Sequence, residues 1–125
     1  MFFKEPKNDK RFYWTLHIKE KMRYYRISEG LLRRILKSPA RQEKGIAPRT
    51  IALMRPAGTK KPSEIWLMYQ LVRQNSSKRN LGGQVSQKKK MISAWRYPGI
   101  SPKGEPIPIP EDIVEELRGR IKDAP

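Results

Sequence analysis

The segment SEIWLMYQLV, residues 63–72, carries the strongest strand pattern in this chain of 125 residues. β-Branched and aromatic side chains dominate it, and such side chains favour a strand. The two-residue period of a strand divides them between two faces. One face carries Ile65, Leu67, Tyr69 and Leu71, and the other carries Trp66, Met68 and Gln70. We expect Trp66, Tyr69 and the later Trp95 to lie in the core rather than to stack on bases.

Three further strands are predicted around this one. RTIALMRP (49–56) precedes it across a turn, KMISAWRY (90–97) follows it, and ARQEKGIA (40–47) suits a short edge strand. In the last strand, alternation places Ile92, Ala94 and Arg96 on one face and Met91, Ser93, Trp95 and Tyr97 on the other. The segment between the two long strands, residues 73–90, is rich in turn residues and cations and predicts a long basic loop.

Helical periodicity marks both ends of the chain. FYWTLHIKEKMRYY (12–25) begins a helix that Thr15 can cap, and Ser28 can cap a second helix over EGLLRRILK (29–37). PEDIVEELRGRIK (110–122) predicts a third, with acids at its start and bases at its end. The residues expected to meet in one core are Ile18, Met22, Leu32, Ile35, Leu67, Ile92 and Ala94.

The element order predicts an α+β fold. An N-terminal helical hairpin packs on one face of a three- or four-stranded antiparallel sheet, the other face stays open to a ligand, and a C-terminal helix follows. We expect one α+β domain over residues 12–98. Residues 99–125 form a Pro-rich extension with the last helix, and residues 1–11 are flexible.

The charge of the chain points to a polyanionic partner. The chain has 28 Lys and Arg residues and 12 Asp and Glu residues, which gives a net charge of +16. Residues 1–97 carry +18 and residues 98–125 carry −2, counted from the same sequence. Nucleic acid is the first candidate for such an excess and an anionic membrane surface the second. No segment resembles a signal peptide or a membrane span, so we expect a cytoplasmic protein.

The residue inventory excludes several kinds of site. There is no Cys and a single His, which excludes disulfides, a Cys nucleophile, and zinc sites built from thiolates or from several histidines. No P-loop is present, since no Gly-rich segment precedes Lys-Ser or Lys-Thr. We therefore expect neither a metal nor an organic cofactor.

His17 is the first candidate for proton transfer, although the phenols of Tyr24, Tyr25 and Tyr97 can also serve as acids near RNA. The ordinary pKa of His17 near neutrality suits general acid–base attack by a 2′-hydroxyl on the adjacent phosphate. Lys21 shares a helical face with it, and Arg96 at a strand end could join Lys21 in stabilising the phosphorane charge. The alternative is a structural histidine that caps the first turn or bonds a strand carbonyl.

Cations and exposed phenols define the predicted RNA contacts. Basic runs supply affinity and salt dependence rather than sequence choice, and aromatic side chains can stack on bases. The predicted nucleic-acid-binding residues are Tyr24, Arg33, Arg34, Lys60, Lys61, Lys78, Arg79, Lys88, Lys89, Lys90 and Tyr97.

Three motifs carry a family resemblance. The string H-x-x-x-K-M-x-x-Y-x-I-S from His17 to Ser28, EIWLMYQ (64–70) and KKMISAWRYPG (89–99) resemble a family of small bacterial domains of unknown function. That family is similar to the BrnT and RelE toxins, within the barnase–EndoU–colicin–RelE fold. The resemblance implies a metal-independent ribonuclease architecture, or a descendant that kept only RNA binding.

Three functions follow as expectations. The first is an RNA-binding protein that acts as a metal-independent, toxin-type endoribonuclease on RNA, ribosomal RNA included. The second is a non-catalytic RNA- or ribosome-binding module of the same fold. The third is an interaction domain whose basic surface meets an acidic antitoxin.

Overall fold

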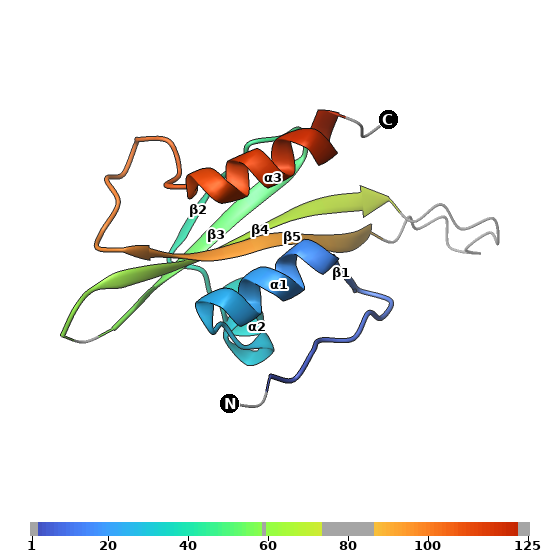
Figure 1. Cartoon of the computed structure of the whole chain (residues 1–125), viewed down its shortest axis with the longest axis horizontal. Coiled ribbons are helices and arrows are strands. Elements are labelled where there is room, and N and C mark those ends of the chain that lie inside the picture. The colour runs from blue at the N-terminus through green and yellow to red at the C-terminus, as the bar shows by residue number, and fades with distance from the viewer. Residues whose placement is uncertain (1–2, 59, 74–86, 123–125) are drawn as a thin grey trace.

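The structure, a computed structural model, describes residues 3–58, 60–73 and 87–122. Its elements in chain order are β1 (Phe12–Trp14), α1 (Leu16–Tyr25), α2 (Glu29–Lys37), β2 (Arg41–Lys44), β3 (Thr50–Ala57), β4 (Ser63–Arg73), β5 (Gln87–Pro98) and α3 (Glu111–Lys122) (Figure 1). The α+β class is confirmed.

The sheet is larger than predicted and it is mixed. Its five strands run in the order β1-β5-β4-β3-β2. Neighbours from β2 to β5 are antiparallel, whereas β1 pairs with β5 in parallel. The sequence prediction of three or four antiparallel strands missed β1, because its three residues stand directly before a helix cap. The prediction also began the last strand at Lys90, whereas β5 starts at Gln87, so Lys88 and Lys89 lie in a strand rather than in the loop.

The helical hairpin forms at the predicted caps. Thr15 Oγ1 accepts a hydrogen bond from Ile18 N–H, and Ser28 Oγ accepts one from Leu31 N–H. Each bond satisfies an N–H that would otherwise have no partner inside the helix. Between them Arg26 ends α1 with φ 58°, and its N–H donates to the last carbonyls of the helix.

The first face of the sheet carries the hairpin. Ile18 and Met22 of α1 and Leu32 and Ile35 of α2 pack there in a cluster with the sheet. The strands contribute Phe12, Trp14, Leu53, Ile65, Leu67, Tyr69, Met91 and Ala94. Six of the seven predicted core residues belong to this cluster, and Ile92 does not.

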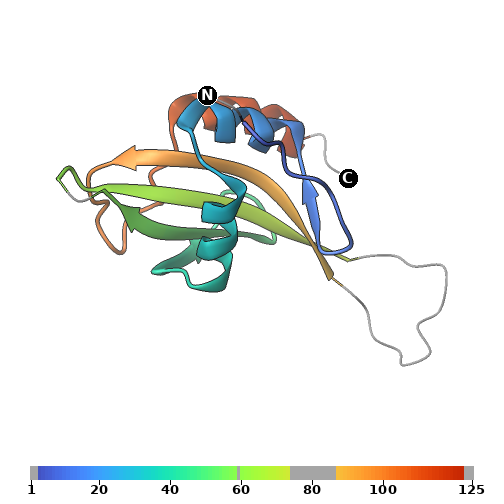
Figure 2. The ribbon, with the colours of Figure 1, turned by 90° about the horizontal axis from the view of Figure 1, so that it is seen from below.

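The second face is covered, which corrects the expectation of an open ligand face. Ile113 and Leu117 of α3 are buried against Ala52, Met54, Trp66, Met68 and Trp95. Trp66 and Trp95 stack there with centroids 6.1 Å apart. In Figures 1 and 2, α3 (red) lies along β5 beside α1 (blue). The acidic start of α3 adds an ion pair to this apolar contact, because Asp112 lies 3.0 Å from Lys21 of α1.

A β-bulge explains the misplacement of Ile92. The β4–β5 register shifts between Met68 and Tyr69, so Met68 pairs with Ser93 and Tyr69 pairs with Met91. Ile92 is the extra residue opposite that step, and it packs on the second cluster while Met91 lies in the first. One inserted residue reverses which face the preceding side chains occupy. The predicted faces are therefore wrong for Met91 and Ile92 and right for Ala94 and Trp95.

Candidate nucleic-acid interface

His17 and Lys21 belong to a polar cluster under α3, which we call the α3 clamp. It consists of His17, Lys21, Ser93, Asp112 and Glu116. His17 Nε2 lies 2.9 Å from Ser93 Oγ, and Nδ1 lies 2.8 Å from Glu116 Oε2. Lys21 Nζ lies 3.0 Å from Asp112 Oδ2 and 3.1 Å from Glu116 Oε1. The clamp thus ties α3 to α1, and His17 in turn ties α1 to β5.

Within the clamp, Lys21 and Asp112 each shift the pKa of the other toward its charged form. Burial lowers the pKa of Lys21, but its hydrogen bonds to Asp112 and Glu116 outweigh this and raise the pKa above its ordinary value of 10.5. The same bond from Lys21 holds the pKa of Asp112 below 3.8. Both groups are therefore charged at neutral pH, and the ion pair stabilises the docked helix.

The contacts Ser93–His17–Glu116 follow the serine–histidine–acid order of a catalytic triad. The exposure of the serine and the acid, however, is the reverse of that in a working triad. A working triad opens its serine oxygen to substrate and buries its acid. Here Ser93 is 0% exposed and His17 is 1% exposed, whereas the Glu116 side chain is 42% exposed. The imidazole therefore has no route to a substrate while α3 is docked, and its contacts are those of a structural histidine.

Arg96 does not join the predicted catalytic group. On β5 it pairs with Ile65, a member of the first cluster, whereas Ser93 pairs with Met68 of the second cluster. The two side chains therefore lie on opposite faces of the sheet. An Arg96 Nη2–H donates to the Tyr25 carbonyl at 3.3 Å, at the C-terminal end of α1. The structure brings His17 and Lys21 together and places Arg96 elsewhere, because the strand alternation separates positions 93 and 96.

Four cations meet at a hollow between α2 and the start of β5, which we call the basic cleft. Arg11, Arg33, Lys37 and Lys89 line it together with Phe12 and Leu36. Its volume is about 400 Å³. Arg33 and Lys89 were predicted contacts, and β1 brings them together because Phe12 pairs with Lys89. Arg11 and Lys37 were missed as contacts, since Arg11 lies in the N-terminal segment expected to be flexible and Lys37 is a lone cation at the end of α2.

Stacking holds the arginines of the basic cleft in place. The guanidinium carbons of Arg11 and Arg33 lie 5.4 Å and 4.9 Å from the centroid of the Phe12 ring. Arg33 Nε also lies 2.7 Å from Glu29 Oε2, one helical turn earlier. Such contacts restrict the side chains, so less entropy is lost when they bind a phosphate.

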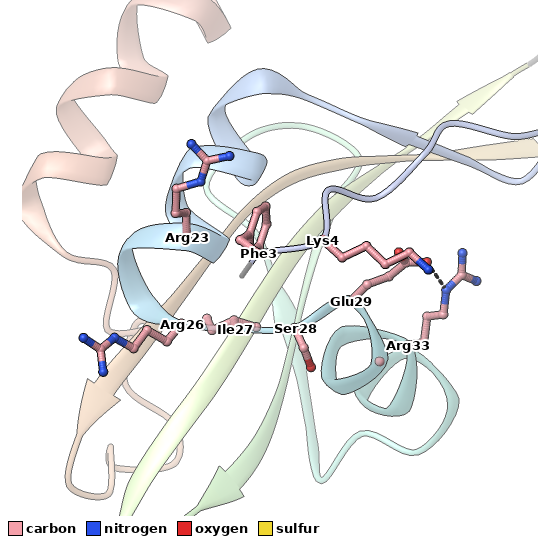
Figure 3. Close-up of a pocket in the computed structure, with 9 residues that line it drawn as sticks. Phe3, Lys4, Arg23, Arg26, Ile27, Ser28, Glu29 and Arg33 are labelled. Carbon is pink, nitrogen blue, oxygen red and sulfur yellow. Dashed lines mark hydrogen bonds and ion pairs between the residues drawn. The ribbon is translucent and has the colours of Figure 1, made fainter. Parts of the chain in front are cut away.

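A second hollow adjoins the basic cleft and shares Arg33 with it; we call it the Phe3 pocket (Figure 3). It has a volume of about 610 Å³. Phe3 and Lys4 form one wall, and the turn from α1 to α2 forms the other. Its full lining is Phe3, Lys4, Arg23, Arg26, Ile27, Ser28, Glu29, Gly30 and Arg33. The two hollows together gather seven cations and, of the residues that line them, one carboxylate.

The other predicted contacts are scattered. Arg34 is exposed on α2, and Tyr24 is 73% exposed on α1. Lys88 and Lys90 alternate with Lys89 on β5, so they point to the other face of the sheet. Lys60 and Lys61 lie at the β3–β4 turn, at the opposite end of the sheet (Figure 1), and Tyr97 packs partly on the second cluster. Lys78 and Arg79 lie outside the described residues.

A second buried polar network was missed by sequence reasoning. Glu64, 2% exposed, accepts hydrogen bonds from Trp66 Nε1–H and from the backbone and hydroxyl of Ser101. Arg41 donates to Ser101 Oγ at 2.8 Å and to the Pro102 carbonyl at 3.2 Å. The network fixes the chain where it leaves β5. No local sequence pattern predicts this network, because its members lie far apart in the sequence.

No protein-family model, curated protein or solved structure matches the chain. Within the described residues, no cluster of His, Asp and Glu side chains could hold a metal ion. None of the three helices, as far as the structure describes them, is long and apolar enough to span a membrane.

Proposed function

We propose that this chain binds single-stranded RNA in the basic cleft, without cleaving it. The observation that carries the proposal is the convergence of Arg11, Arg33, Lys37 and Lys89 with no carboxylate in the lining. Glu29 pairs with Arg33 and the Asp9 carboxylate interacts with Arg11 and Arg33, but four cations still outnumber these two carboxylates. A phosphate backbone that binds such a positive hollow releases its counterions. Arginine side chains already held against Phe12 offer flat, forked donors that suit phosphate oxygens.

The choice of RNA rests on two supports. The resemblance to the BrnT and RelE toxins implies an RNA substrate or ligand. Two exposed aromatic side chains outside the cleft lining, Tyr13 on β1 and Tyr24 on α1, can stack on unpaired bases. The bases of a duplex are stacked on one another and leave no face free for an aromatic side chain, so we propose a single-stranded ligand.

Binding is favoured over cleavage by the burial of His17. A general base must come within hydrogen-bond reach of the hydroxyl that it deprotonates. His17 contacts Ser93 and Glu116 instead and is 1% exposed. Toxin-type cleavage would need α3 to leave first, whereas binding in the basic cleft needs no rearrangement.

The test is a titration of a labelled single-stranded RNA with the full chain. The variant Arg33→Gln/Lys89→Gln should weaken binding about tenfold or more, as loss of two phosphate contacts implies. The matched control, Lys44→Gln/Lys103→Gln, removes the same charge from two exposed positions outside both hollows and should change affinity little. Equal loss in both variants would mean diffuse charge rather than a site. Preference for duplex DNA or for an acidic protein would also overturn the proposal.

A further inference from the structure

The Phe3 pocket differs from the basic cleft in shape and in donors. The basic cleft is walled by cations at the sheet edge, where a strand of RNA can pass. The Phe3 pocket is a larger hollow, bounded by the N-terminal segment on one side and by Ile27 and Ser28 on the other (Figure 3). Arg33 lines both hollows, so the two are neighbours on the surface.

The donors around the pocket suit a dianion. Lys4, Arg23 and Arg26 line it in addition to Arg33. Arg23 is held over the Phe3 ring, 5.1 Å from its centroid, so one guanidinium is positioned before a ligand arrives. Arg26 extends away from Phe3 in Figure 3, and its exposed side chain can turn inward. The single carboxylate of the lining, Glu29, pairs with Arg33 at 2.7 Å, so the excess positive charge of the pocket comes from Lys4, Arg23 and Arg26.

Backbone N–H groups add to the positive potential of the pocket. The first residues of α2, Glu29 and Gly30, line the pocket, and the first N–H groups of a helix have no intrahelical acceptor. Gly30 also leaves room, since a Cβ built there would meet only Ser28 Oγ, at 4.0 Å. The helix start by itself would attract any anion weakly; the added cations make the pocket suited to a group with more than one negative charge.

We propose that the Phe3 pocket binds the terminal phosphate monoester of the RNA strand that occupies the basic cleft. An internal phosphodiester carries one negative charge, whereas a terminal monoester carries about −1.5 to −2 at neutral pH and has three acceptor oxygens. Several cations and backbone donors in one hollow match the monoester better. This inference rests on the proposed function, since the cleft supplies the rest of the strand. The monoester can come from a 5′ or a 3′ end.

The experiment compares one short RNA with three ends: 5′-phosphate, 3′-phosphate, and hydroxyls at both ends, each labelled away from the end that varies. One phosphorylated form should bind about tenfold tighter than the hydroxyl form. Arg23→Gln and Lys4→Gln should remove that preference and leave the affinity for the hydroxyl form nearly unchanged. Inorganic phosphate should abolish the preference for the phosphorylated RNA at concentrations that leave binding of the hydroxyl form unchanged.

The variant Gly30→Glu distinguishes an effect on the pocket from an effect on the stability of the fold. It brings a carboxylate into the hollow, yet glutamate in the first turn of a helix is stabilising and better than glycine there. It should abolish the preference for a phosphate end while the melting temperature stays level or rises, and Gly30→Gln should keep part of the preference. Equal binding of all three RNAs would overturn this inference and leave the proposed function intact. Absence of binding to any RNA would overturn both.

Discussion

His17 Nε2 lies 2.9 Å from Ser93 Oγ, a bond that joins the first turn of α1 to β5 beneath α3. Both side chains are buried. Replacing His17 with Ala leaves the serine without this partner, and loss of a buried hydrogen bond costs about 1–3 kcal/mol. We expect the free energy of unfolding in urea to fall by that amount, with RNA affinity unchanged. If His17→Ala removed cleavage of bulk RNA in the presence of chelator, at unchanged stability, the imidazole would be catalytic and our account of it wrong.

Lys21 should decide whether α3 stays docked. Lys21→Met keeps the length of the side chain and removes the charge that binds Asp112 and Glu116. Two carboxylates then lose their cation, so α3 should be cleaved faster by protease, and the tryptophan emission of Trp66 and Trp95 should shift to longer wavelength. Lys19→Met is the control, because Lys19 pairs with Glu5 rather than with α3. Unchanged proteolysis in Lys21→Met would show that Ile113 and Leu117 hold the helix unaided.

The same pair predicts how stability depends on pH. The folded pKa of Asp112 is depressed by Lys21, so its contribution is present above the unfolded value of 3.8 and is lost as the pH falls through the folded pKa. The folded pKa of Lys21 is raised, so its contribution is present below 10.5 and is lost as the pH rises through the folded pKa. The difference in urea midpoint between wild type and Lys21→Met should therefore be flat from about pH 5 to pH 9 and shrink at both extremes. A difference that grew in acid would contradict this sign.

Leu67 tests the core. It is 0% exposed on the first face of β4. Leu67→Ala should lower the free energy of unfolding by about 2–5 kcal/mol, the usual cost of a buried Leu-to-Ala change. Val72 on the same strand is 37% exposed, and Val72→Ala should cost about 0.5 kcal/mol. Similar losses in the two variants would place Leu67 outside a packed core.

Local patterns explain why much of the fold was predictable. The two helix caps at Thr15 and Ser28, and the alternation of β4, depend on residues within one or two turns of each other. They therefore appear in the sequence, and the structure confirms them. The same is true of His17 and Lys21, whose shared helical face brings both to Glu116.

Features set by long-range pairing could not be predicted in this way. The bulge opposite Ile92 depends on how β5 meets β4, and the parallel pairing of β1 depends on its return to β5. The covered second face follows from where α3 docks, which its own amphipathic pattern does not specify. The basic cleft arises for the same reason, since its cations come from the residue before β1, from α2 and from β5. Charge counting predicted a polyanion surface but could not say that Lys60 and Lys89 lie at opposite ends of the sheet.

The salt dependence of RNA affinity distinguishes a phosphate-binding site in the basic cleft from diffuse surface charge. For a single strand, the slope of log affinity against log salt is about −0.7 for each phosphate contact. Arg33→Gln/Lys89→Gln should therefore flatten the wild-type slope by about 1.4, whereas Lys44→Gln/Lys103→Gln should leave it unchanged. That result would assign the phosphate contacts to the basic cleft. Equal slopes for wild type and both variants, or binding that does not respond to salt, would contradict it.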